Sequence, residues 1–168
     1  MRAGLAVLRL IVGVLFMGHG LQKLKGWFGG HGVEGTAQAF ESMGLRPGKR
    51  HATAAGVSET LGGGLLALGA LTPVGALLVT STMAVAVDKV HGSNGPWVTE
   101  GGFEYNLVLM AAAFALAAEG PGSASVDDAL GIEISGPVVA LGQLALGLGS
   151  AYAVSRKGVG SEEAPATA

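Results

Sequence analysis

Residues 5–24 read LAVLRLIVGVLFMGHGLQKL, an almost uninterrupted apolar run that decides the fold. About 20 predominantly apolar residues are enough for a helix to cross the hydrocarbon core of a bilayer. Arg2 precedes the run, as in a secretory signal, but no small-residue cleavage site follows it. Lys23 and Lys25 instead form a flank that is typical of a stop-transfer segment. We therefore predict a transmembrane helix that is retained.

The composition of the whole chain agrees with a membrane protein. Apolar residues make up 49% of the 168 residues and charged residues only 13%, whereas a soluble domain carries about 25%. The 30 glycines lie mostly within apolar runs, where they let helices approach closely. The absence of cysteine excludes disulfides and thiolate metal sites within this chain. A net charge of −2 without a basic face argues against nucleic acid. The expected partner is the lipid bilayer.

Further apolar segments follow the first, at residues 53–71, 73–90, 103–118 and 137–154. Pro73 separates two of them with almost no loop, because proline suits the first turn of a new helix. The longest polar connection, residues 26–50, is expected to hold a short interfacial helix over residues 36–43. The fold class we predict is all-α: a polytopic transmembrane bundle of four core helices with a fifth, C-terminal helix.

The distribution of lysine and arginine predicts the orientation in the membrane. With five spans, the connections 26–50 and 91–102 lie on the same side as the C-terminus, and that side carries most of the Lys and Arg. The other side has only Arg2 and the nearby Arg9. Cytoplasmic loops carry an excess of positive charge. We therefore expect an external N-terminus and a cytoplasmic C-terminal tail.

Ionisable residues within the apolar segments are candidates for function, because charge is costly inside a bilayer. These residues are Arg9, His19, Lys23, Glu59, Asp88 and Glu104. All except Arg9 are expected near one membrane face. His19 and Lys23 share a helix face, and Glu59 lies at a similar depth, so one of the two should be its partner. Three interpretations stay open: a structural ion pair, a polar ligand pocket or proton relay, and side chains that reach the interface without partners.

Other motifs carry less chemical information. The remaining histidines, His31, His51 and His91, fall in loops or at segment ends, which argues against a haem held in mid-membrane. No HExxH-type spacing occurs, so we predict no metal site. Residues 30–35 match G-x-G-x-x-G, but an apolar helix precedes them where a nucleotide-binding unit needs a strand. Residues 104–106, Glu-Tyr-Asn, fit either a helix first turn or part of a polar site.

Three stretches together resemble the DoxX family of small bacterial membrane proteins. They are HGLQKLKGWFGGHGVEGTAQAF (residues 19–40), AGVSETLGGGLLALGALTP (residues 55–73) and GGFEYNLVL (residues 101–109). The resemblance covers residues 5–120 and implies a four-helix membrane bundle in the bacterial cytoplasmic membrane. We accordingly divide the chain into a DoxX-like core at residues 1–120, an acidic loop with an additional apolar helix at residues 121–154, and a disordered tail at residues 155–168.

The resemblance also implies a function, because some family members are linked to thiosulfate:quinone oxidoreductase and others to oxidoreductase assemblies in oxidative-stress defence. The first hypothesis is a membrane subunit of such an assembly, with no intrinsic cofactor, a quinone as its ligand and a soluble oxidoreductase as the electron-donating partner. The alternative is a non-enzymatic scaffold or anchor that recruits soluble partners, and a transporter ranks last. Small-residue helix faces make a homo-oligomer plausible, and whether the chain itself catalyses a reaction stays open. The candidate polar cluster or quinone site comprises His19, Gln22, Lys23, Glu59, Glu104, Tyr105 and Asn106.

Overall fold

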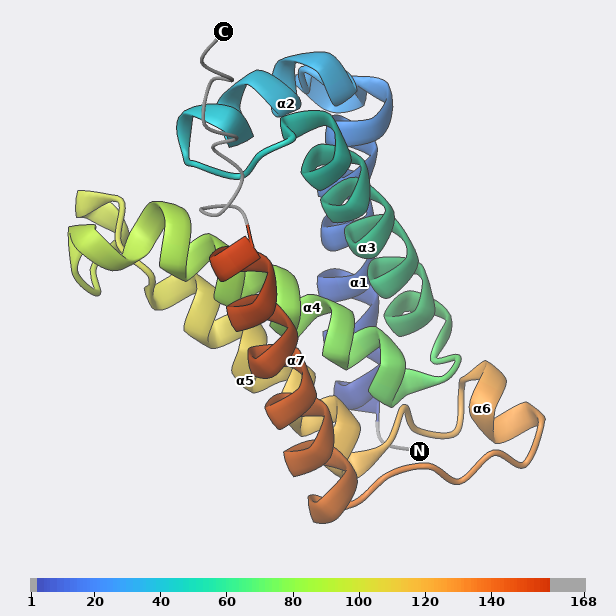
Figure 1. Cartoon of the computed structure of the whole chain (residues 1–168). Coiled ribbons are helices and arrows are strands. Elements are labelled where there is room, and N and C mark those ends of the chain that lie inside the picture. Colours follow the sequence, from blue (N-terminus) through green and yellow to red (C-terminus); the bar gives the residue numbers. More distant parts are fainter. Residues whose placement is uncertain (1–2, 158–168) are drawn as a thin grey trace, which may run out of the picture.

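The computed structural model describes residues 3–157, in which helices are joined by turns and loops and no strand occurs (Figure 1). The five main helices are α1 (Ala3–Lys25), α3 (Gly48–Leu68), α4 (Thr72–Ala86), α5 (Glu104–Glu119) and α7 (Pro137–Lys157). Each of them corresponds to one of the apolar segments in the sequence. The all-α bundle is therefore confirmed.

Short helical elements join the main helices. They are η1 (Trp27–Gly29), α2 (Gly32–Ser42), η2 (Val87–His91), η3 (Gly92–Asn94), η4 (Val98–Glu100) and α6 (Val126–Ala129). The α2 helix corresponds to the expected interfacial helix but begins four residues earlier than residue 36. The η2 element is a π-helical turn that continues directly from α4.

The helices form two arms that meet near their lower ends in Figure 1. One arm consists of α1 and α3 packed side by side, with α2 lying across their upper ends. The other consists of α4, which packs against both α5 and α7. Contacts between α3 and α4 join the arms, and a buried apolar core that includes Phe16, Leu66, Val79 and Leu116 fills the junction. The arms separate above this junction.

Glycine determines how closely α1 and α3 approach. A Cβ atom added to Gly13 would lie 2.5 Å from the carbonyl oxygen of Gly63, and one added to Gly63 would meet the backbone nitrogen of Met17 at a comparable separation. No real side chain tolerates such contacts with backbone atoms, so the glycines permit backbone-to-backbone packing. This packing fixes the register between the two helices.

Three helices are long and apolar enough to cross a membrane, judged by length and composition over residues 3–157: Ala3–Lys25, Thr72–Asn94 and Pro137–Arg156. The first turn of α3 carries Lys49, Arg50 and His51, and α5 has only 16 residues. The five-span topology therefore stays a prediction for these two helices. Large apolar side chains such as Leu15, Val138 and Leu146 are exposed on the outer surface, as contact with lipid requires.

The acidic connection between α5 and α7 is docked onto the bundle. Both carboxylate oxygens of Asp127 are used: one accepts from the backbone nitrogen of Leu71 at 2.7 Å, and the other from the nitrogen and hydroxyl of Thr72. These contacts satisfy the first amides of α4, which lack partners within the helix. On the same end, the buried guanidinium of Arg9 donates to the carbonyls of Ala67, Pro121 and Ala124.

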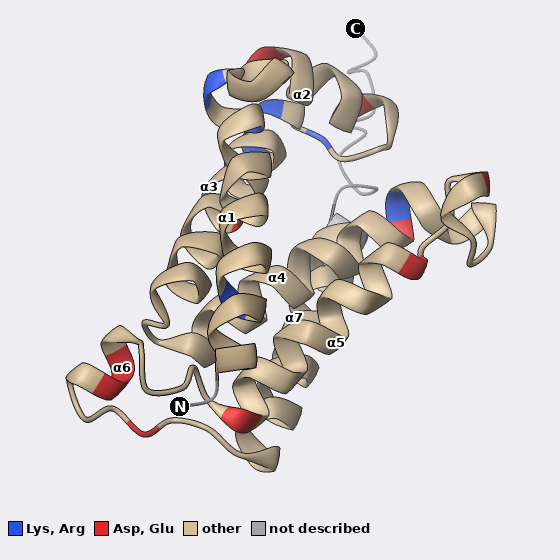
Figure 2. Cartoon of the chain, turned by 180° about the vertical axis from the view of Figure 1, so that it is seen from behind, with Lys and Arg blue, Asp and Glu red and all other residues tan. Residues whose placement is uncertain are grey.

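The charged residues are distributed unevenly along the molecule. Figure 2 shows Lys and Arg gathered over α2 and the adjacent ends of α1 and α3, and a group of acidic residues around α6 at the opposite end.

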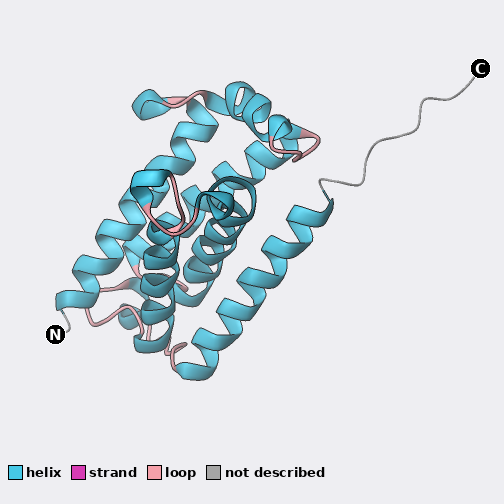
Figure 3. Cartoon of the chain, turned by 90° about the vertical axis from the view of Figure 1, so that its left-hand side faces the viewer, coloured by secondary structure: helices cyan, strands magenta, loops and turns pink. Residues whose placement is uncertain are grey.

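Figure 3 shows α7 running unbroken along the bundle to the end of the described chain. That helix continues through Lys157, so residues 155–157 of the expected tail are helical. The rest of the expected tail, residues 158–168, lies outside the described residues.

Candidate functional site

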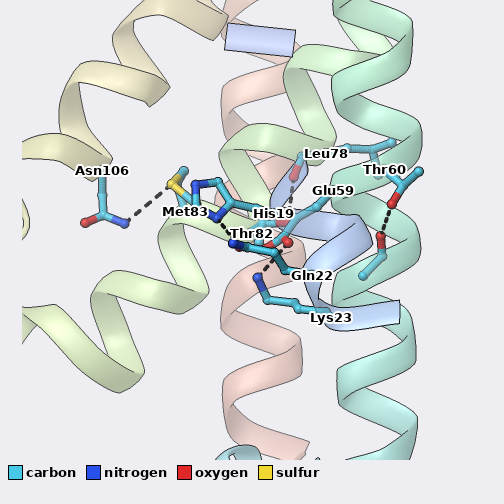
Figure 4. Close-up of polar contacts among 10 residues, drawn as sticks. His19, Gln22, Lys23, Glu59, Thr60, Leu78, Thr82, Met83 and Asn106 are labelled. Atoms are coloured by element: carbon cyan, nitrogen blue, oxygen red, sulfur yellow. Dashed lines mark hydrogen bonds and ion pairs between the residues drawn. The ribbon is translucent and has the colours of Figure 1, made fainter. Parts of the chain in front are cut away.

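A buried ion pair joins the two helices of the first arm. Lys23 Nζ of α1 lies 2.7 Å from Glu59 Oε2 of α3 (Figure 4). The Glu59 side chain is 4% exposed and the Lys23 side chain 24%. The expectation that Glu59 takes a cation from the first span is thus confirmed, and the cation is Lys23. His19, one helical turn before Lys23, lines the same cavity as Glu59.

A short chain of hydrogen bonds orients the imidazole of His19. Gln22 Nε2 donates to the backbone carbonyl of Phe28 at 3.2 Å, so the amide oxygen of Gln22 faces the His19 ring. That oxygen lies 3.0 Å from His19 Nδ1 and can only accept, so Nδ1 carries the proton. His19 Nε2 is left as the ring nitrogen that can accept or exchange a proton. Phe28 itself has a left-handed backbone with φ of 53°.

The space between the arms is a cavity of about 440 Å³. Ligand pockets in proteins span about 300–1,000 Å³ and are mostly apolar with a few polar groups. The walls of this cavity come from both arms, from the segment after α2 and from the start of α5. Apolar side chains predominate, among them Phe16, Phe40, Met83 and Leu109. The polar groups are His19, Lys23, His51, Ser58, Glu59, Ser81, Thr82, Lys89, His91, Tyr105 and Asn106.

The structure brings most of the predicted site residues to this cavity. His19, Lys23, Glu59, Tyr105 and Asn106 line it. Asn106 is 5% exposed, and its amide donates to the sulfur of Met83 at 3.4 Å, which ties α5 to α4 along the wall (Figure 4). Tyr105 is half exposed at the rim.

The two other predicted residues lie off the cavity wall. Gln22 acts on the cavity through His19, as described above. Glu104 lies in the first turn of α5, and its Oε1 accepts from the backbone nitrogen of Val98 at 2.8 Å. That bond folds the connection before α5 back onto the helix. Glu104 thus holds in place the connection that carries Val98, which lines the cavity.

Three basic residues at the cavity were not among the predicted site residues: His51, Lys89 and His91. His51 belongs to the first turns of α3, eight residues and therefore about two turns before Glu59, on the same helix face. That spacing was readable in the sequence. Lys89 and His91 reach the cavity through the π-helical turn η2, a kind of element that often marks functional sites. The ring of His91 is held by a bond from Nδ1 to the carbonyl of Gly101 at 2.7 Å.

The remaining ionisable candidates have other positions. Arg9 lies at the far end of α1, bound to backbone carbonyls. Asp88 faces a second cleft between α4 and α7, and pairs with Lys89 at 3.2 Å. Among residues 3–157, no group of three or more His, Asp or Glu side chains is arranged to hold a metal ion.

The fold and the cavity define a small helical membrane protein with a buried charge pair at the wall of a ligand-sized space. The chain belongs to the DoxX family, whose model matches residues 4–92. It is similar to the Bacillus subtilis protein named "Putative oxidoreductase CatD", with 34% identity over 113 residues, which cover 67% of this chain and 78% of that protein. No solved structure matches. The family match includes Lys23, Glu59, His51 and Lys89, and ends before α5 and α7.

Proposed function

We propose that the protein is an integral membrane subunit of an oxidoreductase assembly, and that its cavity binds a quinone. The observation that carries the proposal is the Lys23–Glu59 pair at the wall of an otherwise mostly apolar cavity of ligand size. Membership of the DoxX family and the name of the Bacillus subtilis relative support the oxidoreductase role. In the hydrocarbon region, such polar groups are costly and mark functional sites by default.

The residues at the cavity fit the chemistry of a quinone. A quinone head group carries two carbonyl oxygens that accept hydrogen bonds, and its reduction takes up two electrons and two protons. Lys23 and Tyr105 are donors from opposite arms, and the Nδ1–H of His19 is fixed by Gln22 so that Nε2 is free for proton exchange. Glu59 is the carboxylate through which a proton can pass. Phe16 belongs to the apolar wall against which the quinone ring would pack.

The electrons come from a partner in this proposal. The chain has no cysteine for an iron–sulfur cluster. We propose that a soluble oxidoreductase docks at the end of the bundle where Lys and Arg gather (Figure 2). We propose that this end lies on the cytoplasmic side of the bacterial membrane, because cytoplasmic loops carry an excess of positive charge. The cavity then lies toward the cytoplasmic face, and the chain crosses the membrane five times.

A scaffold or anchor is the second candidate, and one observation favours it. The Lys23–Glu59 pair joins α1 to α3, the same two helices that Gly13 and Gly63 pack tightly. An ion pair in this position can have a purely structural role, in which it fixes the register of the bundle. In that case the cationic end recruits partners and the cavity holds no redox ligand.

The test is purification from membranes in mild detergent, followed by mass spectrometry of extracted quinone and by titration with a short-chain ubiquinone analogue. We expect bound quinone and saturable binding in the wild-type protein, and at least a tenfold loss of affinity in Glu59→Gln. The matched control is Glu34→Gln, which removes an exposed carboxylate paired with Lys49 at 2.5 Å. If the wild-type protein binds no quinone but still captures a soluble partner, the scaffold interpretation holds and the quinone proposal fails.

A further inference from the structure

The second cleft, between the end of α4 with η2 and the C-terminal half of α7, has a volume of about 410 Å³. Ala84, Leu148 and Ala151 form its apolar part. The polar lining residues lie toward the C-terminal ends of the two elements and are Asp88, Lys89, Tyr152, Ser155 and Arg156. The cleft therefore has a polar end and an apolar end, as a molecule with a head group and a hydrocarbon chain requires.

The charged groups of this cleft carry an excess of one positive charge. Lys89 Nζ lies 3.2 Å from Asp88 Oδ2, so these two charges match each other. Arg156 is the remaining cation, and its Cζ lies 5.0 Å from the centre of the Tyr152 ring. Within residues 3–157, Arg156 pairs with no carboxylate. The contact with an aromatic face leaves the N–H donors of the guanidinium available to an anion.

A buried hydroxyl lies next to Arg156 along α7. Ser155 is 7% exposed, and its Oγ has no hydrogen-bond partner among the described residues. Asp88 lines the same cleft, but its carboxylate does not complete a hydrogen bond with this hydroxyl. Buried polar groups in proteins are almost always hydrogen-bonded. An acceptor oxygen in the cleft would supply the partner that Ser155 lacks.

The position of the cleft suits the head-group region of a bilayer. The two candidate spans that form it are Thr72–Asn94 and Pro137–Arg156, so its polar end lies near the ends of both spans. Tyr152 is exposed there, as aromatic residues at a membrane interface are. Leu148, at the apolar end, is exposed on the outer surface, where contact with lipid is expected. Basic pockets between transmembrane helices are a known kind of site for lipid head groups.

We propose that this cleft binds an anionic phospholipid, with its phosphodiester beside Arg156 and Ser155 and an acyl chain along the apolar end. A phosphodiester carries one negative charge, which matches the excess charge of the cleft, and its oxygens accept hydrogen bonds from a guanidinium in a fork geometry. The head group of phosphatidylglycerol adds only hydroxyl groups to this phosphodiester. That of phosphatidylcholine adds a positive charge, which Arg156 repels.

This site is distinct from the proposed quinone site. The cleft and the cavity share only Lys89, so the lipid binds whether or not the cavity holds a quinone. The head groups of both lipids contain a phosphodiester, so the selectivity between them depends on the net charge of the head group.

The test compares dioleoylphosphatidylglycerol with dioleoylphosphatidylcholine, which have identical acyl chains, by native mass spectrometry of the full-length protein in detergent. We expect the anionic lipid to bind at least fivefold more tightly. Arg156→Gln should reduce its affinity about fivefold and leave the zwitterionic lipid unchanged. Ser155→Ala should weaken the anionic lipid about twofold to threefold. Asp88→Asn removes the carboxylate that opposes the phosphodiester, so it should tighten binding of the anionic lipid.

The matched control is Arg50→Gln, which makes the same chemical change at an exposed position of α3 outside the cleft. We expect it to keep the selectivity for the anionic lipid. Equal losses in Arg50→Gln and Arg156→Gln would show a general attraction of lipid to basic residues, and they would overturn the proposal. Equal affinity of the wild-type protein for the two lipids would overturn it as well.

Two further measurements complete the test. Inorganic phosphate should not displace the anionic lipid, because it makes no contact with the apolar end; displacement at millimolar phosphate would show a site for free phosphate instead of lipid. Thermal unfolding shows whether each variant keeps its fold, and Ser155→Ala and Asp88→Asn carry the test if Arg156→Gln folds poorly. Quinone affinity should be the same in Arg156→Gln as in the wild type, so the lipid and quinone proposals can fail separately.

Discussion

Gln22 presents its amide oxygen to Nδ1 of His19 at 3.0 Å, one helical turn away, while its amide nitrogen is held by the carbonyl of Phe28. The orientation of a cavity-lining imidazole is therefore set by a residue that does not line the cavity. A hydrogen bond of this kind, made by a residue outside the cavity, fixes which ring nitrogen of the histidine carries the proton.

This relationship predicts the effect of replacing Gln22. Gln22→Met keeps the length of the side chain but removes the acceptor, so the Nδ1 proton of His19 is no longer fixed. We expect the ¹⁵N signals of the His19 ring to shift toward a mixture of tautomers, and quinone affinity to fall severalfold. The control is Gln38→Met, at an exposed position on α2. Unchanged ring signals in Gln22→Met would refute the orienting role.

The Lys23–Glu59 pair predicts a non-additive double substitution. Lys23→Met leaves the buried carboxylate of Glu59 unpaired, and we expect a loss of about 2 kcal/mol in unfolding free energy. Adding Glu59→Gln should recover part of that loss, because the uncompensated charge is then gone. Unfolding in mixed detergent, measured for the wild type, both single variants and the double variant, gives the coupling. Strictly additive losses would show that the two side chains do not interact.

The glycine contacts predict opposite results at neighbouring positions of α3. Gly63→Ala places a Cβ against the α1 backbone, so it should destabilise the bundle by about 2 kcal/mol or more. Gly64→Ala has open space around the new Cβ, and it should be neutral or stabilise the protein by about 0.5 to 1 kcal/mol. Thermal unfolding of the pair of variants is the measurement. Equal effects at both positions would contradict the close packing of α1 and α3.

The docked connection predicts a structural role for Asp127. Asp127→Ala leaves the first amides of α4 and the Thr72 hydroxyl without their acceptor, and we expect a cost of about 2 kcal/mol. Asp128→Ala, an exposed carboxylate in the same short helix, should have little effect. The measurement is again thermal unfolding. Because this end is away from the cavity, quinone affinity at a temperature where both variants are folded should not change.

Much of the architecture follows from hydrophobicity alone. Apolar runs of about 20 residues locate helices in a membrane protein, and the rise of 1.5 Å per residue places Glu59 level with Lys23. The pairing of these two residues was predictable for that reason. Tyr105 and Asn106 were predicted from their place at the start of a helix and from the family resemblance, and they do line the cavity.

Other features depend on contacts that the sequence does not display. Lys89 and His91 reach the cavity because α4 continues into a π-helical turn, which shifts the face on which each side chain lies. The docking of Asp127 onto Leu71 and Thr72 joins residues more than fifty positions apart. No local pattern encodes such a distant pairing. The spacing between His51 and Glu59 is visible in the sequence. His51 lies in a polar segment before the predicted span, however, so the spacing did not suggest that its side chain lines the cavity.

The glycine packing of α1 on α3 also has a mechanical consequence. Two helices in backbone contact cannot slide or tilt against each other without steric clash, so the first arm moves as one rigid body. Any change in the width of the cavity must then be a swing of the second arm about the junction, where Gly62 and Gly75 bring α3 and α4 together. Spin labels at Gln38 and Val98, one on each arm, would report that swing as a change in their separation when ligand is added. A constant separation would show that ligand enters a space of fixed shape.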